Sequence, residues 1–170
     1  MKTTLIVQSP SKSYPKNMES ILREIAASEK WIRVFVAMAY TTISGVRKLL
    51  EIFSENDLNV NTHWVLGLDD FVTQPGAIDL CAALSRSEIR IASFSKNGAR
   101  FHPKVFVFES KNKKTMLVGS ANLTAFGIRR NGEAGVQLES RSTNESAEIE
   151  KFVMHLWKMG RMPDSVNSLL

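Results

Sequence analysis

The residues with reactive side chains gather between positions 100 and 135 of the chain. His102 and Lys104 stand two residues apart at the start of a short apolar run that reads as a strand. Because side chains alternate between the two faces of a strand, His102 and Lys104 point to one face and Pro103 points to the other. The sequence therefore predicts an imidazole and an ammonium group side by side.

These residue types suit the cleavage of a phosphodiester bond, which needs a nucleophile, a proton for the leaving oxygen and groups that bind the phosphoryl oxygens. Neutral His102 can attack phosphorus and form a covalent phosphohistidine. Lys104, Ser120 and Asn122 are candidates to hold the non-bridging oxygens. A carboxylate on the other ring nitrogen would fix the tautomer of His102, and Glu133 is the candidate for that task. The stretch offers no carboxylate cluster for two metal ions, so we expect catalysis without metal or cofactor.

The arrangement resembles the phospholipase D superfamily, whose signature is His-x-Lys, then an acidic residue, then Gly-Ser-x-Asn. The corresponding elements here are His102 and Lys104, Glu109, and residues 119–122. The superfamily usually carries Asp at the position of Glu109, which is a candidate structural acid. Glu133 matches a downstream acid that partners the catalytic histidine in the superfamily's nucleases. The resemblance is closest to single-motif nucleases, including the catalytic domain of metal-independent restriction endonucleases.

One motif supplies one histidine, whereas the reaction requires both a nucleophile and a general acid. The other histidines, His63 and His155, have no Lys two residues further on. The resemblance implies a homodimer that places two motifs across a two-fold axis and forms one composite site. His102 of one subunit would attack, and His102 of the partner subunit would protonate the leaving group. Two histidines so placed titrate as a coupled pair.

The two halves of the motif also have simple structural interpretations. A His-Pro-Lys triplet at the start of a strand can be an ordinary surface feature. Residues 119–122 fit a strand-to-helix turn in which Ser120 or Asn122 caps the next helix. Helix N-termini also bind phosphate, so capping and function are compatible. The lysines at 111, 113 and 114 fit a hairpin connector, with ligand contact as the alternative.

The chain carries an excess of positive charge, with 22 Lys plus Arg against 17 Asp plus Glu and a net charge of +5. An excess of this size is common on solvated surfaces, so its distribution matters more. Basic residues concentrate in or beside the reactive stretch, which predicts a polyanionic partner, double- or single-stranded DNA, bound in a salt-sensitive way. The candidates for substrate binding are Lys114, Gly119, Arg129 and Arg130, and the other basic residues of this region are Lys96, Arg100, Lys104, Lys111 and Lys113.

The order of apolar patterns predicts the elements that position these residues. Dense or alternating apolar runs predict strands, and apolar residues at helical spacing predict helices. Strands and helices that alternate in this way indicate an α/β fold, with a mixed, largely parallel central sheet covered by helices on both faces. Strands are expected at 3–7, 31–39, 63–68, 88–94, 102–109 and 115–118 and after Glu133, a polar loop at 95–99, and helices at 18–26, 42–53, 73–84 and 145–157.

The predicted helices have recognisable caps and apolar faces. Thr42 or Ser44 could cap the second helix, and Pro75 suits the first turn of the third. The inner face of the third helix is expected to carry Ile78, Cys81, Ala82 and Leu84, and that of the last helix Ile149, Phe152, Val153, Leu156 and Trp157.

Length and composition bound the architecture. A chain of 170 residues with 44% hydrophobic content suits a single domain over residues 1–170. A single cysteine, Cys81, excludes an intramolecular disulfide and fits a reducing cytoplasm. The N-terminal apolar run is too short for a signal peptide, and no stretch is long enough to span a membrane. We therefore expect a cytoplasmic protein without a membrane partner.

Several alternatives remain open at this point. The same chemistry would serve a lipid phosphodiesterase or phosphatidyl transferase, and a catalytically silent domain could bind nucleic acid through the basic residues alone. Asp69 and Asp70 could bind a metal ion or lie at the rim of the substrate site. If the chain is the catalytic part of a restriction enzyme, its target-recognition domain lies beyond Leu170 or on another chain.

Overall fold

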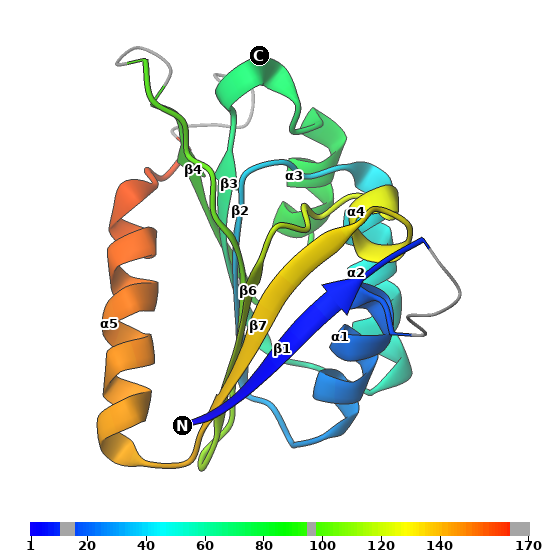
Figure 1. The fold of residues 1–170 in the computed structure, drawn as a ribbon. Helices are drawn as coiled ribbons and strands as arrows, with labels where there is room; N and C mark the ends of the chain where they lie inside the picture. Colours follow the sequence, from blue (N-terminus) through cyan, green and yellow to red (C-terminus); the bar gives the residue numbers. More distant parts are fainter. Residues whose placement is uncertain (11–15, 95–97, 164–170) are drawn as a thin grey trace.

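The structure is a computed structural model that describes residues 1–10, 16–94 and 98–163. Within these residues one sheet of seven strands forms the centre of the molecule, and helices cover both of its faces (Figure 1). The strands are β1 (Lys2–Gln8), β2 (Arg33–Met38), β3 (Asn61–Gly67), β4 (Ser87–Ala92), β5 (Lys104–Glu109), β6 (Lys114–Gly119) and β7 (Glu133–Ser140). The helices are α1 (Met18–Ala27), α2 (Ile43–Glu55), α3 (Pro75–Ala82), α4 (Ala125–Arg129) and α5 (Thr143–Met159), with a short 3₁₀ helix η1 (Asp69–Phe71) after β3.

The strand order is β1-β7-β6-β5-β2-β3-β4. The predicted mixed α/β sheet is confirmed, but the expectation that most pairs are parallel is wrong. Only β2, β3 and β4 pair in parallel, whereas β5 is antiparallel to β2 and the pairs β5–β6, β6–β7 and β7–β1 are antiparallel. A parallel pair needs a long crossover, and the short connection from β5 to β6 permits only an antiparallel hairpin.

Two hydrophobic cores form on the two faces of the sheet. Helices α1 to α4 lie on one face, and α5 crosses the other (Figure 1). The alternation along β5 shows the division, because Phe106 and Phe108 enter the core under α1 to α4 while Val105 and Val107 enter the core under α5. Lys104 has the parity of Phe106, so its side chain emerges on the face that carries α1 to α4.

The helix boundaries agree with the sequence patterns except in detail. Thr42, rather than Ser44, caps α2, because its hydroxyl oxygen accepts a hydrogen bond from the Gly45 N–H at 3.2 Å. Two residues predicted for apolar faces are exposed, namely Ala82, which ends α3, and Phe152, which is 38% exposed on α5. Both lie at the margins of their apolar stripes, where the 3.6-residue period turns a side chain towards solvent. The loop predicted at 95–99 lies partly outside the described residues.

Glu19 of α1 is the centre of a set of ion pairs that joins three helices. This carboxylate is 7% exposed and accepts hydrogen bonds at 3.0 Å from Arg23 and from Arg129 of α4, while the Lys48 Nζ of α2 lies 3.8 Å away. The hydrogen bond from Arg129 is the largest cause of the low pKa of Glu19, about 2. The buried acid thereby fixes α4, which follows the Gly-Ser-x-Asn segment, against α1.

Glu19→Gln should lower the free energy of unfolding near pH 7 by about 2 to 3 kcal/mol, because the variant leaves the arginines without their buried counter-charge. The folded pKa of Glu19 is depressed, so its stabilisation is complete above the unfolded value of 4.5 and is lost as pH falls towards about 2. Urea denaturation at about pH 7 and about pH 3 should show the difference from wild type shrinking at the lower pH. Glu24→Gln, which removes an exposed pair with Lys16, is the matched control. A loss independent of pH would contradict the ion-pair explanation.

Candidate active site

The directions of the strands bring the reactive residues to one edge of the sheet. Because β5 and β7 run antiparallel to β2 and β6, the first residues of β5 and β7 lie beside the last residues of β2 and β6. Lys104 pairs with Met38 on one side, and one step beyond the Val105–Val118 pair it reaches the level of Gly119. Sites in open α/β sheets often lie at such an edge.

His102 and Lys104 lie side by side, as the period of two in a strand requires. The ammonium of Lys104 lies 2.9 Å and 3.0 Å from the two ring nitrogens of His102, and it donates to the His102 carbonyl oxygen at 3.0 Å. His102 is exposed just before β5 begins, whereas Lys104 is only 8% exposed. The buried ammonium of Lys104 thus contacts the solvent-exposed imidazole of His102.

Burial and positive charge shift both titrations. The pKa of His102 lies below its usual value of 6.5, mainly through partial burial and also through the charges of Lys104 and Arg100. Burial likewise lowers the pKa of Lys104, and the carboxylate of Glu133 opposes that shift. His102 is therefore a neutral imidazole near pH 7, which is the form that can act as a nucleophile.

Ser120 and Glu133 lie together at the adjoining ends of β6 and β7. The Ser120 hydroxyl donates to the Glu133 carboxylate and accepts from the Ala134 N–H at 3.0 Å. Asn131 also donates to Glu133, at 3.2 Å. We expected Glu133 to bind His102, but no hydrogen bond joins these two side chains within the described chain. Its carboxylate instead holds Ser120 and favours the charged form of Lys104.

Asn122 has an unusual environment for an amide. Its side-chain Oδ1 is buried and has no hydrogen-bond partner among the described residues. The cap of α4 is Thr124, whose hydroxyl accepts from the Gly127 N–H at 2.9 Å, so Ser120 and Asn122 do not cap that helix. The Oδ1 of Asn122 only accepts hydrogen bonds, so a phosphate group, whose oxygens are also acceptors, would be bound by the side-chain N–H of Asn122 rather than by Oδ1.

Gly119 and Gly135 face each other across β6 and β7. A Cβ at Gly119 would lie 2.7 Å from the Ala134 carbonyl oxygen, and one at Gly135 would lie 2.7 Å from the Val118 carbonyl oxygen. The strands therefore approach more closely here than any side chain allows. Gly119, predicted as a substrate-binding residue, has a steric role that the structure makes explicit.

Two predicted site residues lie far from the others. Glu109, the last residue of β5, and Lys114, the first residue of β6, lie at the ends of these strands that are away from His102. Five residues of strand place Glu109 roughly 16 Å from Lys104. Lys114 pairs with Glu109 at 3.0 Å and with Glu150 at 2.5 Å, and Glu109 also pairs with Arg33 at 2.6 Å. Glu109 is thus part of an ion-pair network with α5, and Lys114 is not brought to the site.

Some of the other basic residues form ion pairs with acidic side chains, and others are exposed to solvent. Arg129 is held by Glu19, and Lys113 is 6% exposed and pairs with Glu139 at 3.2 Å. Arg130 is exposed, with its guanidinium 5.8 Å from the Phe126 ring centroid. Lys96, which we also counted among the basic residues, lies outside the described residues.

Sequence reasoning missed the aromatic neighbour of His102. The Tyr40 ring, just after β2, meets the imidazole edge to face with centroids 5.6 Å apart. The Tyr40 hydroxyl donates to Asp70 at 3.0 Å, and the Arg100 Nε donates to the same carboxylate at 2.6 Å. The position of Tyr40 at a strand end is the only signal that could have suggested it.

Asp69 and Asp70 form hydrogen bonds that hold segments next to His102 in place. Asp69 is 2% exposed and accepts from the backbone N–H groups of Phe94 and Phe101 at 2.9 Å and 2.7 Å. It thereby anchors the segment that leads into His102. Within the described residues no group of three or more His, Cys, Asp or Glu side chains could hold a metal ion.

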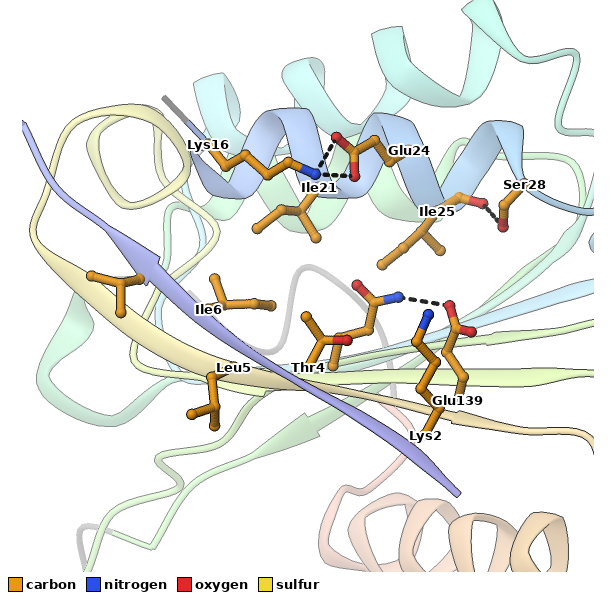
Figure 2. A pocket seen from close by; sticks show the side chains of 12 residues that line it. Lys2, Thr4, Leu5, Ile6, Lys16, Ile21, Glu24, Ile25, Ser28 and Glu139 are labelled. Carbon is orange, nitrogen blue, oxygen red and sulfur yellow. Dashed lines mark hydrogen bonds and ion pairs between the residues drawn. The ribbon is translucent and has the colours of Figure 1, made fainter. Parts of the chain in front are cut away.

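A separate cavity of about 660 Å³ lies between α1 and the sheet edge formed by β1 and β7 (Figure 2). Its polar side chains are largely paired with one another, as in the ion pair of Lys16 with Glu24 and the 2.8 Å hydrogen bond from Gln137 to Glu139. None of the reactive residues lines it, so the candidate site is not this cavity.

Comparison with known proteins agrees with this geometry. A family model described as "Cardiolipin synthase, PLD-like domain" matches residues 21–157. Among solved structures, the chain is similar to NucT from Helicobacter pylori, with a TM-score of 0.69, 13% identity and coverage of 95% of this chain and 99% of that one. It is also similar to the phospholipase D family member Nuc from Salmonella typhimurium, with a TM-score of 0.64, 20% identity and coverage of 96% and 100%.

A third structural relative is phosphatidylserine synthase from Haemophilus influenzae, with a TM-score of 0.74, 10% identity and coverage of 98% of this chain and 41% of that one. The search of curated proteins finds no match. Because the family model spans most of the chain, the protein belongs to the PLD-like domain family of the phospholipase D superfamily. No helix in the described part of the chain is long and apolar enough to cross a membrane.

Gly135→Ala should destabilise the protein by about 1 to 3 kcal/mol, because the added methyl group meets the backbone of β6 at 2.7 Å. Gly132→Ala is the matched control, since nothing lies within 4 Å of the added atom there. Thermal and urea denaturation of the two variants would measure the effect. Equal stabilities for both variants would show that the close strand approach is not a constraint.

Arg100→Gln should raise the pKa of His102, because it removes one positive charge and leaves Asp70 free to favour the imidazolium. NMR titration of the imidazole should give a pKa below 6.5 in the wild type and a higher value in the variant. Arg141→Gln, at the far end of β7, should leave the titration unchanged. An unaltered pKa in Arg100→Gln would exclude the charge effect.

Proposed function

We propose that this protein is a metal-independent phosphodiesterase that cleaves DNA through a covalent phosphohistidine, in a composite site formed by a homodimer. The observation that carries the proposal is the contact between neutral, exposed His102 and buried Lys104. A nucleophile next to a cation is the arrangement that attack on an anionic phosphodiester needs.

In the first step the lone pair of a His102 ring nitrogen attacks phosphorus, and the bond from phosphorus to the leaving oxygen breaks. The composite site holds one proton beyond the two neutral imidazoles, so the partner subunit's His102 is an imidazolium; it gives this proton to the leaving oxygen as general acid and becomes neutral. Lys104 stabilises the negative charge that develops on the non-bridging oxygens, and the side-chain N–H of Asn122 supplies a further hydrogen bond. Ser120 donates to the substrate only if its hydroxyl proton turns away from Glu133. Deep burial of Lys104 strengthens this interaction because water screens it less.

In the second step a water molecule attacks the phosphohistidine. The partner's His102, now neutral, takes a proton from the water as the new oxygen–phosphorus bond forms and the nitrogen–phosphorus bond breaks. Both histidines then regain their starting protonation states. Each chain supplies only one such histidine, which is why the proposal requires two subunits.

DNA is the substrate that the charge distribution supports best. The net charge is +5, and the exposed cations Arg100 and Arg130 flank the segments that carry His102 and Asn122. A positively charged surround attracts a phosphate backbone and makes binding sensitive to salt. Recognition of a particular sequence would need a further module, fused to this chain or separate from it.

A lipid phosphodiesterase or phosphatidyl transferase is the second candidate. The structural likeness to phosphatidylserine synthase favours it, since the same chemistry acts on a phospholipid headgroup. The apolar faces of α1, α2 and α5 pack against the sheet and are not free for a membrane surface. A silent nucleic-acid-binding domain is less well supported because the full set of reactive residue types is present.

Purified wild-type protein should cleave plasmid or single-stranded DNA in excess EDTA, and His102→Ala should lose at least about 10³-fold in rate because the nucleophile is removed. His155→Ala, an exposed histidine on α5, is the matched control and should retain full activity. Sedimentation velocity of the same samples should show a dimer at assay concentrations.

The possible outcomes separate the candidates. Full activity in His102→Ala would refute the mechanism, and full activity in a monomer would refute the composite site. If neither protein cleaves DNA, hydrolysis of a short-chain phosphatidylcholine in the same buffer tests the lipid candidate. Activity in that assay alone would move the assignment to a lipid substrate.

A further inference from the structure

The turn after β3 presents a phenylalanine to solvent in an unfavourable backbone conformation. Phe71 is 99% exposed, with φ of +55°, and the preceding Asp70 has φ of +62°. Bulky residues rarely adopt left-handed φ, and exposure of an aromatic ring forgoes the stabilisation that burial would bring. Strained, solvent-facing residues of this kind cluster at functional sites.

Contacts connect this turn to the candidate nucleophile. The Asp70 carboxylate accepts hydrogen bonds from the Tyr40 hydroxyl at 3.0 Å and from the Arg100 Nε at 2.6 Å. The Tyr40 ring in turn meets His102 edge to face at 5.6 Å. Phe71 therefore directly follows Asp70, which contacts Tyr40, and Tyr40 contacts the imidazole of His102.

The surroundings of Phe71 favour a nucleobase over a protein surface. Its chain neighbours are Asp70, which pairs with Arg100, and Val72, the apolar neighbour in the turn, at 44% exposed. A protein–protein contact normally needs a larger continuous apolar patch. An exposed aromatic ring one residue from the partner of an arginine is a combination that can bind single-stranded nucleic acid, through stacking and backbone attraction.

Arg100 has hydrogen-bonding capacity left for a phosphate. Its pair with Asp70 uses Nε, neither Nη group is hydrogen-bonded within the described residues, and the side chain is 57% exposed. The carboxylate of Asp70 thus holds Arg100 and Tyr40 in place from one side. The guanidinium of Arg100 and the ring of Tyr40 therefore meet at the carboxylate of the residue that precedes Phe71.

We propose that Phe71 is a stacking platform for an unpaired base of the DNA substrate, and that Arg100 binds the backbone phosphate next to that base. This inference rests on the proposed nuclease function and adds a preference for single-stranded substrate. In a duplex the base would be stacked and paired, so the ring could engage it only after unpairing. The exposed ring needs no rearrangement of the protein to receive a base.

The test measures DNA affinity separately from cleavage. Variants are made in the His102→Ala background, and the probe is a fluorescein-labelled single-stranded oligothymidylate, with anisotropy as the readout. Phe71→Ala should raise Kd by about 10-fold, as expected for loss of one base stack. Phe71→Trp should keep the affinity, and its fluorescence should be quenched on binding. Phe152→Ala, an exposed phenylalanine on α5, is the matched control and should bind normally.

Two further probes identify the stacking itself. The effect of Phe71→Ala should nearly vanish with an oligonucleotide of abasic residues and with a fully paired duplex, because neither offers an unpaired base. An equal loss with the abasic probe, or no loss with oligothymidylate, would overturn the inference. A lower sedimentation coefficient of Phe71→Ala without DNA would also overturn it, since Phe71 would then contact a second copy of the chain.

These results are distinguishable from failure of the proposed function. If the wild type cleaves DNA and Phe71→Ala in the His102→Ala background binds DNA as tightly as its parent, only the stacking inference fails. If the His102→Ala parent binds no DNA and the wild type cleaves none, the proposed function fails as well.

Discussion

The candidate site depends on the close approach of β6 and β7 at Gly119 and Gly135. Neither position has room for a Cβ, so the two backbones meet at a distance that only a pair of glycines permits. The Ser120 N–H donates to the Ala134 carbonyl oxygen at 2.9 Å just beyond this point, and the Ser120 side chain then reaches Glu133. A steric constraint in the backbone thus positions the carboxylate that influences the buried ammonium of Lys104.

A buried cation next to an imidazole is costly for an isolated protein. Burial lowers the pKa of both His102 and Lys104, and the described contacts of the Lys104 ammonium are with His102 and, at 5.8 Å from its centroid, the Tyr40 ring, rather than with a carboxylate. Bound phosphate would add the missing negative charge. Electrostatic strain of this kind is typical of sites that are preorganised for an anionic ligand, and it agrees with membership of the phospholipase D superfamily.

The loops around the site are held by buried polar residues from distant parts of the chain. Gln8 at the end of β1 donates to the carbonyl oxygens of Gly127 and Asn131 at 2.9 Å and 3.0 Å. It also accepts from the Met18 N–H at 2.6 Å, so one side chain joins β1, α1, α4 and the loop before Glu133. Rigid support of this kind lets a loop-built site keep its geometry.

The sequence by itself determined the features that depend on local periodicity and on a short motif. The strands, most helix boundaries and the contact of His102 with Lys104 follow from side-chain alternation within a few residues. The tertiary structure alone decided the strand order and which charges are free. Lys114 and Arg129 are engaged by acids far away in the sequence, and Tyr40 reaches the imidazole only through the pairing of β2 with β5. The physical reason is that ion pairing and strand pairing join segments whose separation leaves no local pattern in the chain.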